Sequence, residues 1–132
     1  MNMFTVACLA IGAIVVGGSL VFAGVNYSIS KKEAPGKIAE LRDSIKVIEE
    51  EINNMEALKT ELSNAKNYLI SSKNSFTNGG WVNNGIPLAN NEFSTSIGSL
   101  DTAISECDKY IANCRSLING ANDQISQLQT LL

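Results

Sequence analysis

The sequence contains no histidine, and its 132 residues include only two prolines, one tryptophan and three cysteines. The missing histidine removes the commonest general base and the commonest metal ligand. No residue pattern pairs a nucleophile with a base, cradles a phosphate or spaces Cys, Asp and Glu as metal ligands. We therefore expect no enzymatic activity, no cofactor, no metal ion and no small-molecule substrate.

Charge is absent from the first 30 residues, although the whole chain holds 10 Lys and Arg and 13 Asp and Glu. The net charge of −3 and the lack of a basic stripe argue against a nucleic-acid partner. This division predicts a hydrophobic head over residues 1–30 and a charged remainder over residues 37–132. Residues 31–36, with Pro35-Gly36, are expected to form a hinge between them.

The head contains 23 consecutive uncharged residues, from Met3 to Val25. Because about 20 apolar residues cross a bilayer core, this run predicts a single transmembrane helix. Two alternatives stay open. The run is also compatible with a cleaved signal peptide, since Val21 and Ala23 fit the small-residue positions before a cleavage site. It is compatible as well with a helix that packs inside a filament of many copies.

Small residues recur at regular intervals in this run. Ala10, Gly17 and Gly24 follow one another every seven residues, and Ala13 lies four residues before Gly17. Such spacing lets helix backbones approach closely in lipid, so these four residues are candidate contacts between membrane helices.

The Lys and Arg distribution indicates an orientation. None precedes the hydrophobic run, whereas Lys31, Lys32, Lys37 and Arg42 follow it closely. The positive-inside rule then places the C-terminal part in the cytoplasm, with the exported side as the open alternative.

Two amphipathic stretches follow the head. In the first, apolar residues from Ile38 to Phe76 recur at steps of three and four, which predicts a helix over residues 37–75. Leu58 arrives one residue early after Met55, and this predicts a stammer that overwinds the helix locally.

The second stretch keeps its heptad pattern without a break and predicts a helix over residues 93–131. Its free cysteines fit this pattern as small core residues. The candidate interaction residues of the stripe are Ile97, Leu100, Ile104, Cys107, Ile111, Cys114, Ile118 and Ile125.

The two stretches have equal length and are joined over residues 76–92, where Asn-Gly pairs and Pro87 favour a turn. We expect an all-α fold in which the head is followed by a long antiparallel, coiled-coil-like hairpin. Because two helices cannot enclose a core, we expect the hairpin to form an oligomeric bundle or to bind another helical protein.

The loop between the two helices carries the only tryptophan of the chain, Trp81, with Ile86 nearby. Tryptophan is common among binding hot spots, so Trp81 and Ile86 are candidate anchors for a partner. Alternatively, Trp81 folds back against Phe76 and Phe93 and closes the end of the hairpin.

Gly80-Trp81 and Gly85, placed between two amphipathic helices, resemble the turn of the WXG100 and LXG helical hairpins linked to type VII secretion. The family turn is Trp-x-Gly, whereas here three residues separate Trp81 from Gly85. The family's export signal places an acidic residue four positions after a tyrosine, and Tyr110 is followed at that distance by Cys114. The resemblance implies a helical partner or adaptor protein. A span followed by heptads is similar also to small divisome subunits and to phage spanins.

Taken together, these features predict a membrane-anchored, single-pass helical-hairpin scaffold that self-associates or binds a membrane complex, which could serve secretion. The alternative is a structural subunit of a filament or pore, in which the hydrophobic head packs in the core of the assembly.

Overall fold

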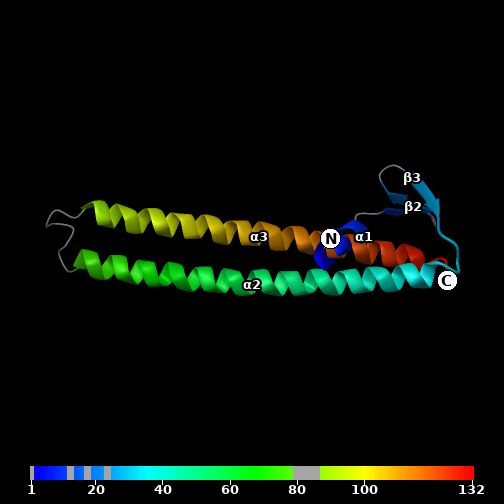
Figure 1. Cartoon of the computed structure of the whole chain (residues 1–132), viewed down its shortest axis with the longest axis horizontal. Coiled ribbons are helices and arrows are strands. Elements are labelled where there is room, and N and C mark those ends of the chain that lie inside the picture. The colour runs from blue at the N-terminus through cyan, green and yellow to red at the C-terminus, as the bar shows by residue number, and fades with distance from the viewer. Residues whose placement is uncertain (1, 12–13, 17–18, 23–24, 79–86) are drawn as a thin grey trace. The chain divides into compact units, whose positions relative to one another are not determined.

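The computed structural model describes residues 2–11, 14–16, 19–22, 25–78 and 87–132; for residues 10, 14–16, 19–22, 25–28 and 87–90 it describes the backbone alone. In chain order the elements are α1 (Met3–Ile11), β1 (Ile14–Val16), β2 (Ser19–Phe22), β3 (Val25–Ser28), α2 (Ala34–Asn78) and α3 (Pro87–Gln129). Two long packed helices form a hairpin, as the heptad patterns predicted (Figure 1).

The prediction of one continuous helix over the hydrophobic head is wrong. A nine-residue helix, α1, is followed by a small antiparallel sheet in the order β1-β2-β3. Val16 pairs with Ser19, and Phe22 pairs with Val25. The physical reason is that β1 to β3 are rich in Ile, Val, Phe and Tyr, which fit a pleated surface better than a helix.

No helix within the described ranges is long and apolar enough to cross a membrane. At 1.5 Å per residue α1 is about 14 Å long, roughly half the thickness of a bilayer core.

Side chains cap the starts of α1 and α2. The Asn2 Oδ1 atom accepts a hydrogen bond from the Thr5 amide at 2.7 Å, and the Ser30 Oγ atom accepts one from the Glu33 amide at 3.3 Å. Such caps satisfy backbone donors that a first helical turn leaves without partners. The sequence Ser30-Lys31-Lys32-Glu33 therefore caps a helix. That helix, α2, begins at Ala34, three residues before the expected start at residue 37.

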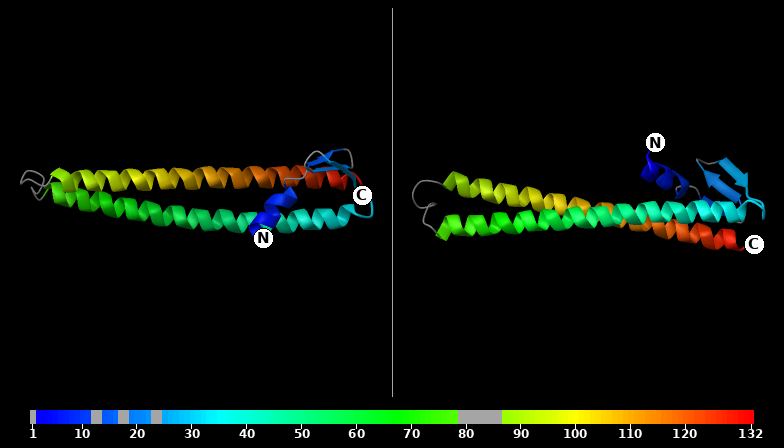
Figure 2. Two further views of the ribbon diagram at one scale, coloured as in Figure 1. Left: turned by 45° about the horizontal axis from the view of Figure 1, so that its top comes forward. Right: turned by 60° about the horizontal axis from the view of Figure 1, so that its bottom comes forward.

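The chain divides into two compact units. The first unit comprises Met1–Asn53 and Ala112–Leu132, and the second comprises Asn54–Ile111. Each of α2 and α3 contributes a segment to both units, and within each unit the two segments lie side by side (Figures 1 and 2).

The two units differ in how completely they bury their apolar side chains. The buried apolar residues of the first unit are Ala7, Ile11, Ala34, Ile38, Leu41, Ile48, Ile52, Cys114, Ala121, Ile125 and Leu128. Among the described side chains of the second unit, only Cys107 and Ile111 are buried. The first unit contains α1 as a third helix, whose Ala7 and Ile11 are themselves buried, and a third helix covers a flank that a helix pair leaves open.

The predicted stammer in α2 is also wrong. Steps of three and four continue past Met55 through positions that are all half-buried, namely Lys59, Leu62, Lys66, Leu69, Lys73 and Phe76. We call these half-buried positions the seam of α2. Lysines occupy every second seam position, because their long aliphatic stems cover apolar surface while the amines stay in water. Leu58, and Ala65 one heptad later, lie exposed on the neighbouring flank.

Gly120 lies inside α3, where glycine costs about 0.5–1 kcal/mol relative to alanine. A Cβ atom at Gly120 would meet no atom within 4 Å. We expect Gly120→Ala to raise the free energy of unfolding by about 0.5–1 kcal/mol in urea denaturation followed by circular dichroism. Gly98→Ala is the matched variant in the second unit, since its Cβ would also meet nothing within 4 Å. A loss of stability at both sites would contradict this helix geometry.

Candidate interaction surface

The structure separates the eight predicted heptad residues of α3 into two groups. Cys107, Ile111, Cys114 and Ile125 are buried in the packing of this one chain. The half-buried group comprises Ile97, Leu100, Ile104 and Ile118. The stripe therefore serves first to pack α3 within the chain, and three of its half-buried members lie in the second unit.

One flank of the second unit carries a regular series of polar contacts between α2 and α3. The Nζ atom of Lys59 lies 2.7 Å from Asp108 Oδ1, that of Lys66 lies 2.5 Å from Asp101 Oδ1, and that of Lys73 donates to Ser94 Oγ at 2.9 Å. We call this set the lysine ladder. Each step adds seven residues in α2 and removes seven in α3, so the segments are antiparallel and their register is fixed.

The lysine ladder sets register more than it adds stability, because exposed ion pairs contribute little. Within the lysine ladder, the hydrogen bond from Lys59 to Asp108 and the negative charge of the Asp108 carboxylate raise the pKa of Lys59 above the ordinary value of 10.5. A folded-state pKa above the unfolded value favours folding at lower pH, and this contribution is lost as the pH rises through the folded-state pKa.

The opposite flank of the second unit carries a hollow that is lined by uncharged residues. A surface groove of 530 Å³, here called the distal groove, is lined by Ala65, Tyr68, Leu69, Thr95, Ser96, Ser99 and Leu100. Asp101 and Ser99 lie about 100° to either side of Leu100, so the lysine ladder and the distal groove are on opposite flanks. Tyr68 is 73% exposed, and Leu58 on the same flank is 39% exposed.

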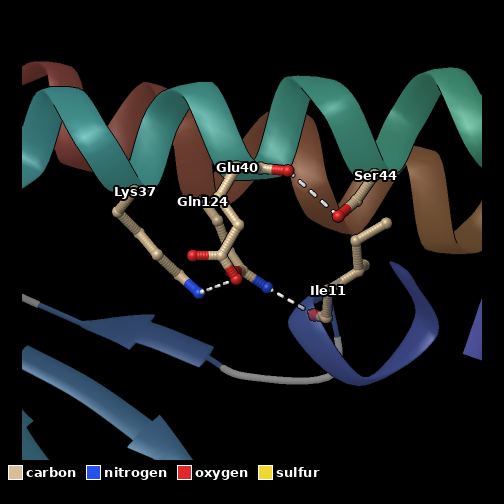
Figure 3. A network of polar contacts seen from close by, with 5 residues as sticks. All are labelled: Ile11, Lys37, Glu40, Ser44 and Gln124. Carbon is tan, nitrogen blue, oxygen red and sulfur yellow. Dashed lines mark hydrogen bonds and ion pairs between the residues drawn. The ribbon is translucent and has the colours of Figure 1, made fainter. Parts of the chain in front are cut away.

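A buried hydrogen bond joins α1 to α3 in the first unit, beside polar contacts within α2 (Figure 3). The Gln124 Nε2 atom donates to the Ile11 carbonyl oxygen at 2.6 Å, and this bond is buried. Ser44, also buried, donates its hydroxyl to the Glu40 carbonyl at 3.0 Å. Gln124 thus satisfies a carbonyl at the end of α1, where a helix leaves its last carbonyls without partners.

The bond from Gln124 to α1 has a cost. Gln124 is only 7% exposed, and its Oε1 atom finds no hydrogen-bond partner in the described part of the chain. A buried polar atom without a partner costs about 1–3 kcal/mol. The attachment of α1 is therefore weaker than its buried residues alone would indicate.

The outer side of α1 is apolar and exposed. Met3, Val6 and Leu9 are 74%, 51% and 45% exposed and follow one another at steps of three. A cleft of 510 Å³ lies beside them, with Met3, Val6 and Ala7 on one wall and Glu40, Asp43, Ser44, Lys46, Val47 and Glu50 of α2 on the other. Burial raises the pKa of the nearby Cys8 thiol, and the Glu51 carboxylate raises it further.

Several predicted site residues lie outside what the structure describes. Trp81 and Ile86, the candidate anchors of the loop, fall in the range 79–86. Ala13, Gly17 and Gly24 also fall outside the described residues, and for Ala10 only the backbone is described. Their proposed contacts stay predictions.

No match identifies the family. No family model, no curated protein and no solved structure matches this chain. Among the described side chains, no group of three or more His, Cys, Asp or Glu is arranged to hold a metal ion. Function is therefore argued from the surfaces alone.

Sequence reasoning missed three features: the lysine ladder, the distal groove and the buried Gln124. The lysine ladder had a signal, since Lys59, Lys66 and Lys73 recur every seven residues opposite Asp108 and Asp101. The distal groove had a weaker sequence signal. Leu58 and Ala65, which lie seven residues apart, interrupt the main heptad pattern of α2 and mark a second apolar stripe beside it. Gln124 had none, since its burial depends on α1, which is distant in sequence.

Proposed function

We propose that this chain is a membrane-attached helical-hairpin interaction protein. In this proposal the hydrophobic head attaches the chain to the bilayer, and the second unit of the hairpin contacts other helices. The proposal includes a cytoplasmic position for the hairpin, supported by the Lys and Arg residues that follow the head.

One observation carries the contact part of the proposal. Leu62, Leu69, Ile97 and Ile104 stay half-buried in the second unit, whereas Leu41, Ile48 and Ile125, at equivalent heptad positions, are buried in the first unit, where α1 adds a third helix. An additional helix would remove the exposed apolar area of the second unit from water, at roughly 25 cal/mol per Å².

Two observations support the attachment part. The head holds 23 consecutive uncharged residues, and α1 exposes Met3, Val6 and Leu9 as an apolar stripe. An apolar stripe of this kind partitions into the boundary between lipid headgroups and acyl chains. The resemblance to type VII secretion hairpins stays a proposal supported by the hairpin and by Gly80-Trp81 in the sequence.

A lysine in the middle of the head tests the attachment. We expect the wild-type chain to stay with membranes after carbonate extraction, and Val15→Lys to pass largely into the soluble fraction. A charged side chain inside the uncharged head opposes its burial in lipid, so the variant should partition toward the aqueous fraction. Asn26→Lys, which adds the same charge just after the hydrophobic run, is the control and should stay with the membrane. Release of the wild-type chain by carbonate would contradict the attachment.

Extraction with a mild detergent tests the contact part in the same preparation. An interaction protein leaves the membrane in a complex heavier than one 14.1 kDa chain in its micelle, as measured by light scattering. A single chain per micelle at native abundance would contradict the proposed contacts.

The alternative function, a filament or pore subunit, is favoured by one specific observation. α1 buries Ala7 and Ile11 against protein and accepts the hydrogen bond from Gln124. A hydrophobic head that packs on protein suits the core of an assembly. Fibres or rings of the purified chain in electron micrographs, together with release by carbonate, would replace the first proposal by this one.

A further inference from the structure

We propose that the distal groove is a self-association site, at which a second copy of this chain packs to form a four-helix bundle over Asn54–Ile111. The inference rests on the proposed contact function and names its partner. Four observations carry it.

The first observation is the absence of charge. None of the seven residues that line the distal groove is ionisable at neutral pH. A nucleic acid, an anionic headgroup or a charged peptide would need opposite charges in the groove. A second copy brings a groove with an equally uncharged lining, so the lining itself places no like charges against one another.

The second observation is self-complementary shape. Tyr68 stands 73% exposed beside a hollow whose other walls include the small residues Ala65, Ser96 and Ser99. In a two-fold symmetric pair the same patch is used on both copies. Tyr68 of each chain can then fill the hollow of the other, and tyrosine is a residue type enriched in interface centres.

The third observation is that the Ser99 hydroxyl depends little on water. The Ser99 Oγ atom donates to the Thr95 carbonyl at 3.1 Å, within its own helix. A hydroxyl that already donates to a carbonyl four residues earlier loses less on burial than one that depends on water. Ser99 can therefore enter an interface with little loss of hydrogen bonding.

The fourth observation is continuity along α2. Ser44, Leu58 and Ala65 are separated by 14 and seven residues and occupy the same heptad position. In the first unit the cleft lined by Ser44 has α1 as its other wall, with Ala7 buried. This heptad position thus accepts a third helix in the first unit and is open to one in the second unit.

The size of the groove sets the expected affinity. The exposed flank runs from Leu58 to Tyr68 on α2, about 15 Å by helix rise. One flank of two such segments offers fewer than the 20–30 residues per side of a standard interface. We expect a dimer with a dissociation constant in the micromolar range, which attachment to a membrane would favour by raising the local concentration.

The test is sedimentation equilibrium of the full chain in density-matched dodecyl maltoside micelles, at about 1–100 µM, a range that brackets a micromolar constant. We expect a concentration-dependent dimer for the wild-type chain. Ala65→Lys with Ser99→Lys should weaken it at least about a hundredfold, because lysines of both copies then face one another.

The control pair, Asn67→Lys with Ser105→Lys, adds the same charge to the same helices at exposed positions on the flank of the lysine ladder. The control should dimerise like the wild-type chain, and circular dichroism should show equal helicity in both pairs.

Tyr68→Ala is a second, milder variant, because Tyr68 is largely exposed and its removal leaves the hairpin packing in place. It too should weaken the dimer. A wild-type chain that stays monomeric at about 100 µM, or a dimer that both groove variants leave unchanged, overturns the inference. A monomeric chain that is nevertheless retained in membranes in a heavier complex overturns the inference alone. A dimer that carbonate releases overturns only the attachment in the proposed function.

Discussion

Replacing Leu41 by alanine is expected to lower the free energy of unfolding by about 2–5 kcal/mol. Leu41 is fully buried in the first unit, so its truncation removes apolar contacts and leaves a cavity. The loss is a large share of the total, because small folded units are stabilised by only about 5–15 kcal/mol. Urea denaturation of the full chain in detergent, followed by circular dichroism at 222 nm, measures the change.

The matched control for Leu41 is Leu69→Ala, in the second unit of the same helix. Leu69 is half-buried and lines the distal groove, so its truncation costs roughly 1 kcal/mol by area. Equal losses for the two variants would contradict the finding that the first unit has the more complete core. A dimer that covers Leu69 would raise its cost as concentration increases, which links this measurement to the proposed self-association.

The hairpin could be predicted from the sequence because one simple rule governs α3. Its inward positions from Ile97 to Leu128 are nearly all apolar, and their spacing alternates between three and four residues. An unbroken apolar period of this kind is satisfied by a helix with one buried stripe. The register of α2 was harder to predict, because apolar residues alone do not mark its seam. Lys59 occupies a seam position through its stem, while the neighbouring Leu58 is exposed.

The head could not be predicted by hydropathy, since an uncharged apolar run fits a helix and a pleated sheet equally well. A local signal for strands was present. Gly17-Gly18 separates the β-branched residues of β1 from β2, and two glycines between such runs indicate a hairpin. The contact between Gln124 and Ile11 joins residues 113 positions apart and had no sequence signal.

Replacing Ile111 by lysine is expected to destabilise the hairpin by at least about 3 kcal/mol, since a buried charge without a partner is strongly unfavourable. Ile111 is only 2% exposed, and its side chain packs within this chain. The variant should therefore lose helicity or unfold at much lower urea concentration than the wild-type chain. Ile104→Lys is the matched control, because Ile104 is half-buried and a lysine there can extend its amine into water.

The pH dependence separates a buried charge from lost packing in the Ile111→Lys variant. Burial lowers the folded-state pKa of a lysine below its unfolded value near 10.4, so the unfolded state binds more protons at neutral pH. The stability of the variant then rises with pH. The difference in free energy of unfolding between the variant and the wild-type chain should therefore become smaller from pH 7 to about pH 10. A gap that stays constant over this range would show that the lysine reaches water, and that α3 does not bury position 111 as tightly as the structure has it. A variant that unfolds loses its oligomers whichever surface they use, so it carries no information about the assembly surface. For this reason Ala65→Lys and Ser99→Lys in the groove test association, whereas Ile111→Lys tests the packing of the hairpin.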